Sequence, residues 1–369
     1  MPITLDNLRR LTVSRSLFAP TTLKRALHKM GFVQADPIRA PARAQDLILL
    51  HRVKNYRAGD LERLYTKLGV EEDFFVTYGF VTRSLQALMH PRPELGVPAD
   101  GRRPWPASRI KLAALLLEFV RERGAVHPRE VDAHFARGNV RSYWGGSSNA
   151  TTQLLDVMHY CGLLRVARRE SGIRIFAAHQ HGEPPSHPAA CRARLDQLVD
   201  AAVRIYSPLP GKSLSFLVRR LGFAAPQWHA ELKAALQRAK QRLAHARIDG
   251  ADWYWPSAED AARHEPDDKV RLLAPFDPIV RDRHRFELLW GWVYRFEAYT
   301  PPPKRKLGYY ALPVLWRDRV IGWANLSVQS GELKSEFGYV ESHPPREPSF
   351  NREMEAELDR IRAFLSLKS

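Results

Sequence analysis

Apolar residues recur every three or four positions through the first part of the chain, with arginine and lysine between them. This spacing is typical of amphipathic helices, and it predicts helices over residues 5–17, 22–30, 42–53 and 60–68. The aromatic and β-branched run at 74–81 predicts a strand. A cluster of prolines and glycines then interrupts the pattern, which indicates a first domain boundary near residue 105.

An order of three helices followed by a β-hairpin is predicted twice in the middle of the chain, and it is the order of a winged helix. Pro128 suits a first helical position, and Asp249-Gly250 is typical of a tight hairpin turn. A linker rich in His and Pro separates the two modules. Their predicted elements are helices 108–123, 128–135 and 147–160 with hairpin 163–176, then helices 192–206, 213–221 and 226–243 with hairpin 246–255.

From about residue 269 the pattern changes to short strands punctuated by proline and glycine, which predicts a small sheet or barrel. The strand-like segments are 271–278, 294–301, 309–315 and 320–326. An amphipathic helix over 351–365 is expected to pack on it. The predicted fold class is α+β, mainly helical, with tandem winged-helix domains followed by a small, barrel-like β-rich domain. The expected domains are a winged-helix-like domain carrying Gln34 and Asp36 (1–105), two winged-helix domains (106–185 and 186–262), and the β-rich domain with its C-terminal helix (263–369).

Lysine and arginine outnumber aspartate and glutamate by 57 to 40, which gives a formal charge of +17. Such a charge favours a polyanionic partner. A basic enzyme with a small acidic substrate is the alternative. Hydrophobic residues make up 44% of the chain, enough to exclude a disordered protein.

Only two cysteines are present, Cys161 and Cys191, and they form no Cys-x-x-Cys motif. The N-terminus lacks the pattern of a secretory signal, and the most apolar stretch, 112–120, is too short to span a membrane. We therefore expect a reduced, cytoplasmic protein with no membrane partner. His179 and His181 match no standard metal spacing with the cysteines, and no glycine-rich phosphate loop is visible, so we expect neither a metal nor an organic cofactor.

Gln34 and Asp36 are the candidate chemical groups. Gly31 is typical of a helix end, and Pro37 disfavours the helical conformation for Asp36. Residues two apart share a face of an extended segment, so the amide and the carboxylate could hold one water between them. The alternative is ordinary turn chemistry, since Asp is common before Pro and Gln34 follows a helix end.

Three groups of residues together resemble the YcaQ/AlkZ-type winged-helix DNA glycosylases, which remove alkylated bases and unhook interstrand crosslinks. The resemblance covers nearly the whole chain in order, and it implies that Gln34 and Asp36 form the catalytic Gln-x-Asp motif of the YcaQ-like branch. Gln45 and Asp46 depart from the bulkier or histidine residues expected after that motif. The matching residues are 33–38 with 42–44, then 142–145 with 164–169, and finally 272–279, 294–299 and 304–313.

The implied chemistry suits one carboxylate. Cleavage of an N-glycosidic bond builds positive charge on the sugar. A carboxylate at about 4 Å, in an effective dielectric near 20, stabilises that charge by roughly 4 kcal/mol. An N7-alkylated purine is already cationic and leaves without a general acid, while Gln34 orients the water. The resemblance thus implies a monofunctional DNA N-glycosylase acting in base-excision-type repair as a monomer.

Double-stranded damaged DNA is the expected partner, and binding it would place the protein on the nucleoid. The basic loop 303–306, made rigid by neighbouring prolines, is a candidate probe that opens the duplex, although it could equally be a solvated turn. The predicted DNA-binding residues are cations near the motif, in this loop and on the third helix of the last module: Arg39, Arg43, Lys304, Arg305, Lys306, Lys233, Arg238 and Lys240.

Three other functions compete with this interpretation. A tandem winged-helix transcription regulator without activity would explain the charge and the repeat. A protein that recognises damaged DNA without cutting it would do so as well. A nuclease is disfavoured, because the sequence lacks clusters of metal-binding carboxylates.

Overall fold

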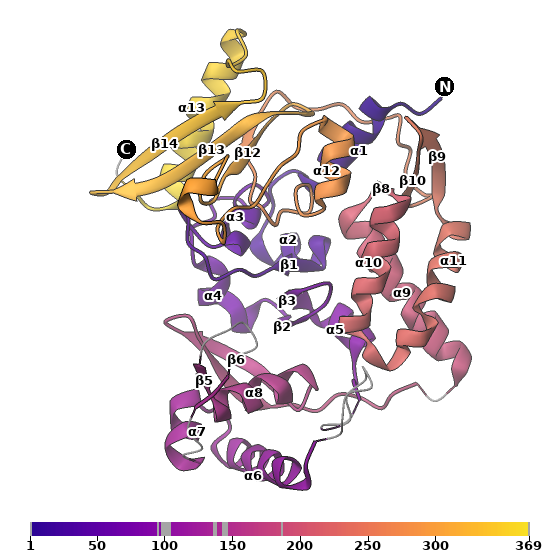
Figure 1. Ribbon diagram of the computed structural model, residues 1–369, viewed down its shortest axis with the longest axis vertical. Helices are drawn as coiled ribbons and strands as arrows, with labels where there is room; N and C mark the ends of the chain where they lie inside the picture. The colour runs from indigo at the N-terminus through magenta and orange to yellow at the C-terminus, as the bar shows by residue number, and fades with distance from the viewer. Residues whose placement is uncertain are drawn as a thin grey trace. The chain divides into compact units, whose positions relative to one another are not determined.

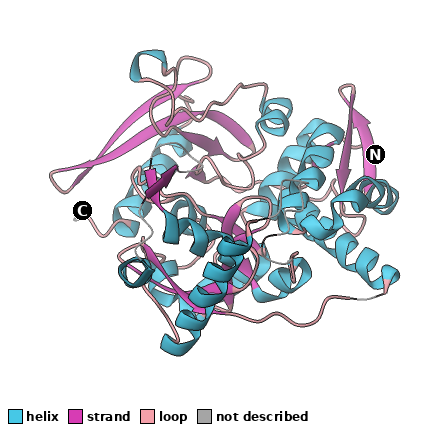
Figure 2. Ribbon diagram, turned by 60° about the horizontal axis from the view of Figure 1, so that its bottom comes forward, coloured by secondary structure: helices cyan, strands magenta, loops and turns pink. Residues whose placement is uncertain are grey.

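A computed structural model describes residues 2–93, 96, 105–135, 139–141, 147–185 and 187–367. Helices and small antiparallel sheets follow one another along the chain (Figures 1 and 2). The helices are α1 (Leu5–Ser16), α2 (Leu23–Met30), α3 (Ala44–Leu50), α4 (Asp60–Leu64), α5 (Arg83–Met89), α6 (Ala107–Arg123), α7 (Pro128–Phe135), α8 (Ala150–Tyr160), α9 (Pro188–Tyr206), α10 (Gly211–Ala224), α11 (Leu232–Arg242), α12 (Arg283–Trp290) and α13 (Pro348–Phe364), with 3-10 turns η1 (Tyr65–Lys67), η2 (Pro226–Glu231) and η3 (Pro302–Lys304).

The strands are mostly short. They are β1 (Phe32–Gln34), β2 (Val70–Phe74), β3 (Tyr78–Thr82), β4 (Asn139–Arg141), β5 (Ser147–Asn149), β6 (Leu164–Glu170), β7 (Ile173–Ala178), β8 (Leu209–Pro210), β9 (Ala244–Ile248), β10 (Ala251–Trp255), β11 (Val270–Leu272), β12 (Leu312–Trp316), β13 (Arg319–Gln329) and β14 (Glu332–Tyr339). The fold is therefore mixed, with helices and small antiparallel sheets, as the patterning predicted.

The chain forms two compact units, each built from segments that are distant in sequence. Unit 1 comprises Met1–Arg63, Asp200–Leu217 and Leu236–Ser369, and unit 2 comprises Leu64–Val199 and Val218–Ala235. The candidate motif and the C-terminal strands both belong to unit 1. The division into four consecutive domains stays a prediction.

The C-terminal strands of unit 1 form one antiparallel sheet in the order β11-β12-β13-β14. Along β13, buried Val320, Gly322, Ala324 and Leu326 alternate with more exposed residues, as expected of a strand with one covered face. Across residues 263–367, all of which are described, this sheet is open, with β11 and β14 as its edges. Of the two arrangements predicted, a small sheet or a barrel, the structure shows the open sheet, because these edge strands do not pair.

Helix α1 joins two hydrophobic clusters of unit 1. Its Leu8 and Leu11 pack with Trp253, while Val13 packs in a second cluster with Phe286 and the sheet residues. Thr4 and Asn7 form a reciprocal capping box at its start. The N-terminal helix is thus part of the same core as the C-terminal sheet.

Both middle modules contain the predicted helices and hairpin in the predicted order. The strands β4 and β5, which pair between α7 and α8, were not predicted, and α8 begins at Ala150 rather than at residue 147. Helices α6, α7 and α8 precede the hairpin β6-β7, and helices α9, α10 and α11 precede the hairpin β9-β10. The short strand β8 was not predicted, and it pairs with β10. The glycine loop at 143–146, and with it part of the family resemblance, lies outside the described residues.

Two strand predictions were wrong. The run 74–81 is not one strand, because it contains the end of β2, a turn over 75–77 and most of β3. Phe75 and Val76 are fully buried in this turn, so hydrophobicity continues where the chain reverses. Segment 294–301 contains no strand, and the hydroxyl of Tyr294 donates to the carbonyl of Ala311 at 2.7 Å. Helix α12 was missed, although Asp282 caps its first turn.

In the part of the chain that the structure describes, the helices are all too short or too polar to cross a membrane.

Candidate active site

Strand β1 leads into the Gln-x-Asp motif, and its first two residues are buried. Helix α2 ends at Gly31, whose φ of 71° favours glycine, and its N–H donates to the carbonyl of Leu27 at 2.8 Å. Phe32 and Val33 are then buried. Gln34 and the residues up to Asp36 are half-buried, so the polar end of the segment is fixed by its apolar start and remains accessible.

Asp36 makes one side-chain hydrogen bond. Its Oδ1 accepts from the N–H of Ile38 at 2.9 Å, which is the local turn that the alternative interpretation expected. The backbone N–H of Asp36 donates to Oε1 of Gln45 at 3.2 Å. The second oxygen, Oδ2, accepts no hydrogen bond from the described residues. The local turn therefore uses Oδ1 and leaves Oδ2 for the predicted catalytic role.

The electrostatics of Asp36 suit a base. Burial raises the pKa of its carboxyl above 3.8, and the hydrogen bond from Ile38 opposes this only in part. Within the described residues, no cation forms an ion pair with it. A partly desolvated carboxylate without a cation gains more from a nearby positive charge or a proton than a solvated one does.

Gln34 is oriented by Arg281, an arginine of unit 1 that lies far away in the sequence. Nε of Arg281 donates to Oε1 of Gln34 at 3.0 Å, and its guanidinium lies 5.3 Å from the ring centroid of Tyr206. Because a guanidinium only donates, the amide oxygen of Gln34 must face Arg281, which leaves the amide N–H groups for another acceptor. No local pattern singles out Arg281, which lies 247 residues from Gln34.

Aromatic residues of unit 1 lie close to Asp36. Tyr299 is 79% exposed and Tyr310 only 2% exposed. Burial, and then the negative charge of Asp36, raise the pKa of both phenols. The ring centroid of Phe296 lies 5.4 Å from that of Tyr310 and 6.0 Å from that of Tyr299. Both tyrosines fall in the stretches that carried the family resemblance, where the sequence assigned them no role.

Gln45 and Asp46, which follow the motif, form hydrogen bonds that fix the backbone around it. Gln45 is 2% exposed and holds the backbone of Asp36. Asp46 accepts hydrogen bonds from the hydroxyl of Tyr56 at 2.7 Å and from the N–H of Gly59 at 3.0 Å. The departure from the family pattern at these two positions therefore has a structural use in this chain.

The predicted cations near the motif differ in availability. Arg39 is exposed, whereas Arg43 is half-buried in an ion pair with Glu62. Lys304 and Lys306 are exposed, and Arg305 donates to the carbonyl of Thr300 at 2.8 Å. Arg39, Lys304 and Lys306 are thus better placed for phosphate than Arg43 or Arg305.

The carboxylate of Glu297 fixes the backbone at the end of the basic loop. This 4% exposed carboxylate accepts the backbone N–H groups of Lys306 at 2.8 Å and of Leu307 at 2.7 Å. The turn η3 precedes these residues. The loop therefore has a defined backbone that presents its two lysines to solvent.

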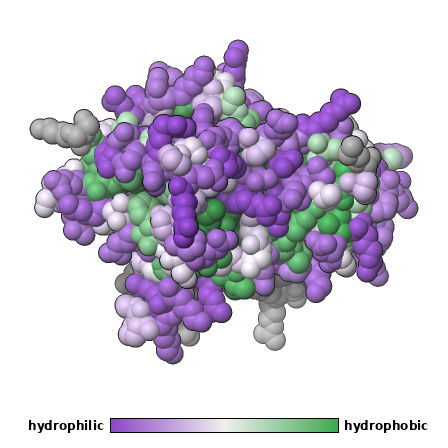
Figure 3. All heavy atoms as spheres, turned by 90° about the horizontal axis from the view of Figure 1, so that it is seen from above, coloured by the Kyte–Doolittle hydropathy of each residue, from purple (hydrophilic) through white to green (hydrophobic). Residues whose placement is uncertain are grey.

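The remaining predicted cations lie on α11. Lys233 is exposed, and Arg238 and Lys240 are half-buried. The ammonium of Lys240 lies 5.5 Å from the ring centroid of Tyr254 on β10. In the view of Figure 3, hydrophilic residues cover most of the face, as expected of a strongly charged protein.

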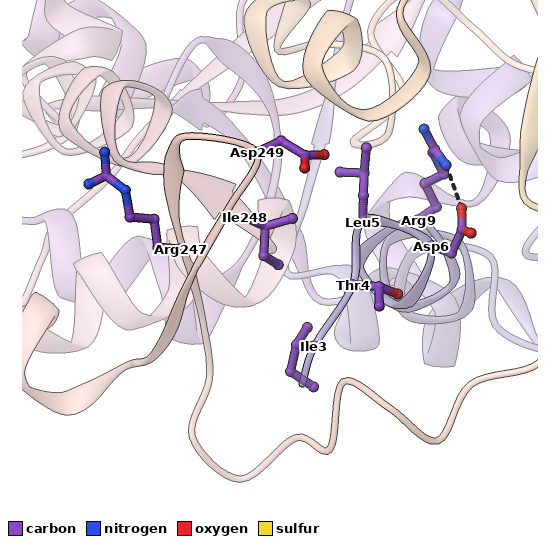
Figure 4. Close-up of a pocket in the computed structure, with 8 residues that line it drawn as sticks. All are labelled: Ile3, Thr4, Leu5, Asp6, Arg9, Arg247, Ile248 and Asp249. Atoms are coloured by element: carbon purple, nitrogen blue, oxygen red, sulfur yellow. Dashed lines mark hydrogen bonds and ion pairs between the residues drawn. The ribbon is translucent and has the colours of Figure 1, made fainter. Parts of the chain in front are cut away.

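A cavity of about 470 Å³ lies elsewhere in unit 1, between the start of α1 and the β9-β10 turn (Figure 4). Arg9 and Asp6 form an ion pair in its wall. It contains neither residue of the motif, so the candidate chemistry is not in this cavity. Its lining residues are Ile3, Thr4, Leu5, Asp6, Arg9, Arg247, Ile248 and Asp249.

Comparison with known proteins identifies relatives of this chain. The structure of the DNA glycosylase AlkZ from Streptomyces sahachiroi is similar to this chain, with a TM-score of 0.65 and 17% sequence identity, over 100% of this chain and 98% of that one. At that identity the similarity concerns the fold. The family model described as DNA glycosylase AlkZ-like matches residues 27–364. Since that match covers more than half of the chain, the chain belongs to the AlkZ-like DNA glycosylase family.

Proposed function

We propose that this DNA glycosylase hydrolyses the N-glycosidic bond of N7-alkylguanine-type purines in duplex DNA and unhooks interstrand crosslinks. Asp36 and Gln34 act at the reacting sugar. The observation that carries this proposal is the half-buried carboxylate of Asp36, two residues along the chain from the oriented amide of Gln34. Within the described residues it has no cationic partner, and its Oδ2 accepts no hydrogen bond.

The bond between C1′ and the purine nitrogen breaks with both electrons going to the base. These electrons neutralise the cationic alkylated ring, so the base leaves without a proton. The deoxyribose becomes positive, and Asp36 stabilises that charge by roughly 4 kcal/mol at about 4 Å, or about a thousandfold in rate. This is the role that carboxylates play in glycoside hydrolysis.

Water completes the reaction. An amide N–H of Gln34 donates to the oxygen of a water molecule, and that water donates to Oδ2 of Asp36. As the oxygen bonds to C1′, its proton passes to Oδ2. The product is an abasic site, which makes the enzyme monofunctional.

Contacts with the phosphate backbone position the lesion. The exposed cations Arg39, Lys304 and Lys306 are the first candidates, and the loop that carries both lysines is proposed as the duplex probe. Arg43, Arg305, Lys233, Arg238 and Lys240 are proposed to add to the basic field. We propose that the enzyme acts as a monomer and that its Gln-x-Asp motif places it with the YcaQ-like branch.

An inactive winged-helix regulator is the competing function. It would need the charge and the helices but not an open carboxylate beside an amide held by Arg281. Catalysis therefore distinguishes the two.

The test is release of 7-methylguanine from methylated duplex DNA, with EDTA present and the enzyme in excess. We expect release by the wild type, a rate at least tenfold lower for Asp36→Asn, and a smaller loss for Gln34→Ala. DNA affinity, measured by fluorescence anisotropy, should be equal for the wild type and Asp36→Asn. Asp359→Asn is the matched control, because this acid is 70% exposed on α13.

Equal rates for the wild type and Asp36→Asn would remove Asp36 from the reaction, and a larger loss in Gln34→Ala would exchange the two roles. A duplex carrying a defined N7-guanine crosslink tests the second activity. Separation of its strands on a denaturing gel supports unhooking, and an intact crosslink alongside active base release contradicts it.

A further inference from the structure

The hydroxyl of Tyr310 is a buried polar group without a partner. The residue is 2% exposed, and its oxygen has no hydrogen-bond partner among the described residues. Other buried tyrosines do bond: the hydroxyl of Tyr294 donates to the carbonyl of Ala311 at 2.7 Å, and that of Tyr56 to Asp46 at 2.7 Å. Buried polar atoms in folded proteins are nearly always paired, so an exception calls for an explanation.

The ring of Tyr310 is held rigidly. It packs edge-on against Phe296, with ring centroids 5.4 Å apart, and the chain enters β12 two residues later. The orientation of the hydroxyl therefore follows from packing, because no polar contact of its own holds it.

The carboxylate of Asp36 lies near the hydroxyl of Tyr310, because its charge acts on that hydroxyl. Burial raises the pKa of Tyr310, and the charge of Asp36 is the largest electrostatic cause after it, ahead of Tyr294, Tyr299 and the opposing Arg283. The phenol therefore stays protonated and can only be the donor in a bond with a carboxylate. Oδ2 of Asp36 accepts no hydrogen bond from the described residues.

We propose that Tyr310 is a positioning residue, whose hydroxyl donates a hydrogen bond to Oδ2 of Asp36 when DNA is bound. This inference rests on the proposed glycosylase function and extends it. The bond keeps Asp36 ionised and fixes its second oxygen, while the N–H of Ile38 already fixes the first. Oδ2 retains a lone pair for the attacking water.

Tyr310→Phe tests this role, because it removes only the hydroxyl and keeps the ring against Phe296. We expect unchanged DNA affinity, an unchanged or slightly higher Tm, and a single-turnover rate lower by about tenfold, as for the loss of a hydrogen bond to a charged group. The acidic limb of the rate profile should move to higher pH, since the ionised carboxylate loses a donor. A merely structural role would not move that limb.

Tyr294→Phe is the matched control. It removes a hydroxyl bonded to the carbonyl of Ala311, so it should lower the Tm and leave the acidic limb in place. If Tyr310→Phe has the wild-type rate and the wild-type acidic limb while Asp36→Asn is still impaired, the inference is overturned and the proposed function stays intact. Absence of base release by the wild type would instead contradict the proposed function.

The titration of Asp36 can also be followed without turnover, by carbon-13 NMR of aspartate-labelled enzyme bound to duplex DNA. A higher pKa for Asp36 in Tyr310→Phe than in the wild type supports the bond. Identical titrations would rule it out.

Discussion

Glu72 and Asp73 on β2 of unit 2 and Asp36 of unit 1 show that burial alone does not determine the direction in which the pKa of a carboxyl shifts. Glu71, Glu72 and Asp73 follow one another on β2 of unit 2 and are at most 3% exposed. Asp36 in unit 1 is only half-buried. Exposure alone would therefore mark the β2 acids as the most perturbed carboxylates in the protein.

Their partners reverse that expectation. Asp73 accepts from His90 and Arg92, each at 2.8 Å, and Arg169 donates to both oxygens of Glu72 at 2.7 and 2.5 Å. Burial raises the pKa of these two acids, but their cationic and hydrogen-bonding partners outweigh it and the net shift is downward. For Asp36, burial acts without a cation, and its pKa rises.

The occupation of both oxygens by hydrogen-bond and ion-pair partners, rather than burial, separates a structural acid from a reactive one. An acid whose oxygens all accept hydrogen bonds from cations or other donors stays ionised at neutral pH and holds the fold together. An acid that is partly desolvated and partly open can still gain a proton or stabilise a new charge.

The largest expected effect is on stability. Asp73→Asn leaves the buried guanidinium of Arg92 without its counter-charge, and breaking such a pair costs about 3–5 kcal/mol of the free energy of unfolding. Asp36→Asn removes an acid without an ion pair and should leave the Tm unchanged or slightly raised. Thermal and urea unfolding of both variants measure the difference. Equal destabilisation by the two changes would break the comparison.

The next effect is on pH dependence. The raised pKa of Asp36 means that base release should fall on acidification with a midpoint above pH 3.8, by about tenfold per unit below it. The lowered pKa values of Glu72 and Asp73 mean that their stabilisation is complete above their unfolded values of about 4 and is lost only at lower pH. Activity should therefore fail before unit 2 unfolds. Rates corrected for spontaneous depurination, compared with circular dichroism over the same range, measure this, and a rate that stays level to pH 3.8 would contradict it.

The smallest effect concerns exposed charges. The double change Lys304→Ala and Lys306→Ala should weaken duplex binding modestly and reduce the slope of log affinity against log salt by about two. The rate for bound DNA should change less than in Asp36→Asn. Lys334→Ala is the control, since this lysine already pairs with Glu332 at 2.5 Å. An unchanged slope in the double variant would remove the loop from the DNA-binding surface.

Much of the local structure could be predicted from sequence, because helix periodicity and turn residues act over a few positions. The order of helices and hairpins in both middle modules agrees with the patterning, and α2 ends at Gly31 as expected. The strand prediction at Phe75 and Val76 was wrong because both side chains are fully buried although the chain reverses there.

By itself, the sequence determined the basic charge, the repeated modules and the pair Gln34 and Asp36, since each depends on residue type and near neighbours. Only the tertiary structure decided that Arg281 orients Gln34 and that Asp36 keeps one oxygen open, while three consecutive acids on β2 are buried among cations. The physical reason is that desolvation and ion pairing depend on groups brought together by folding, such as Arg281 from 247 residues away.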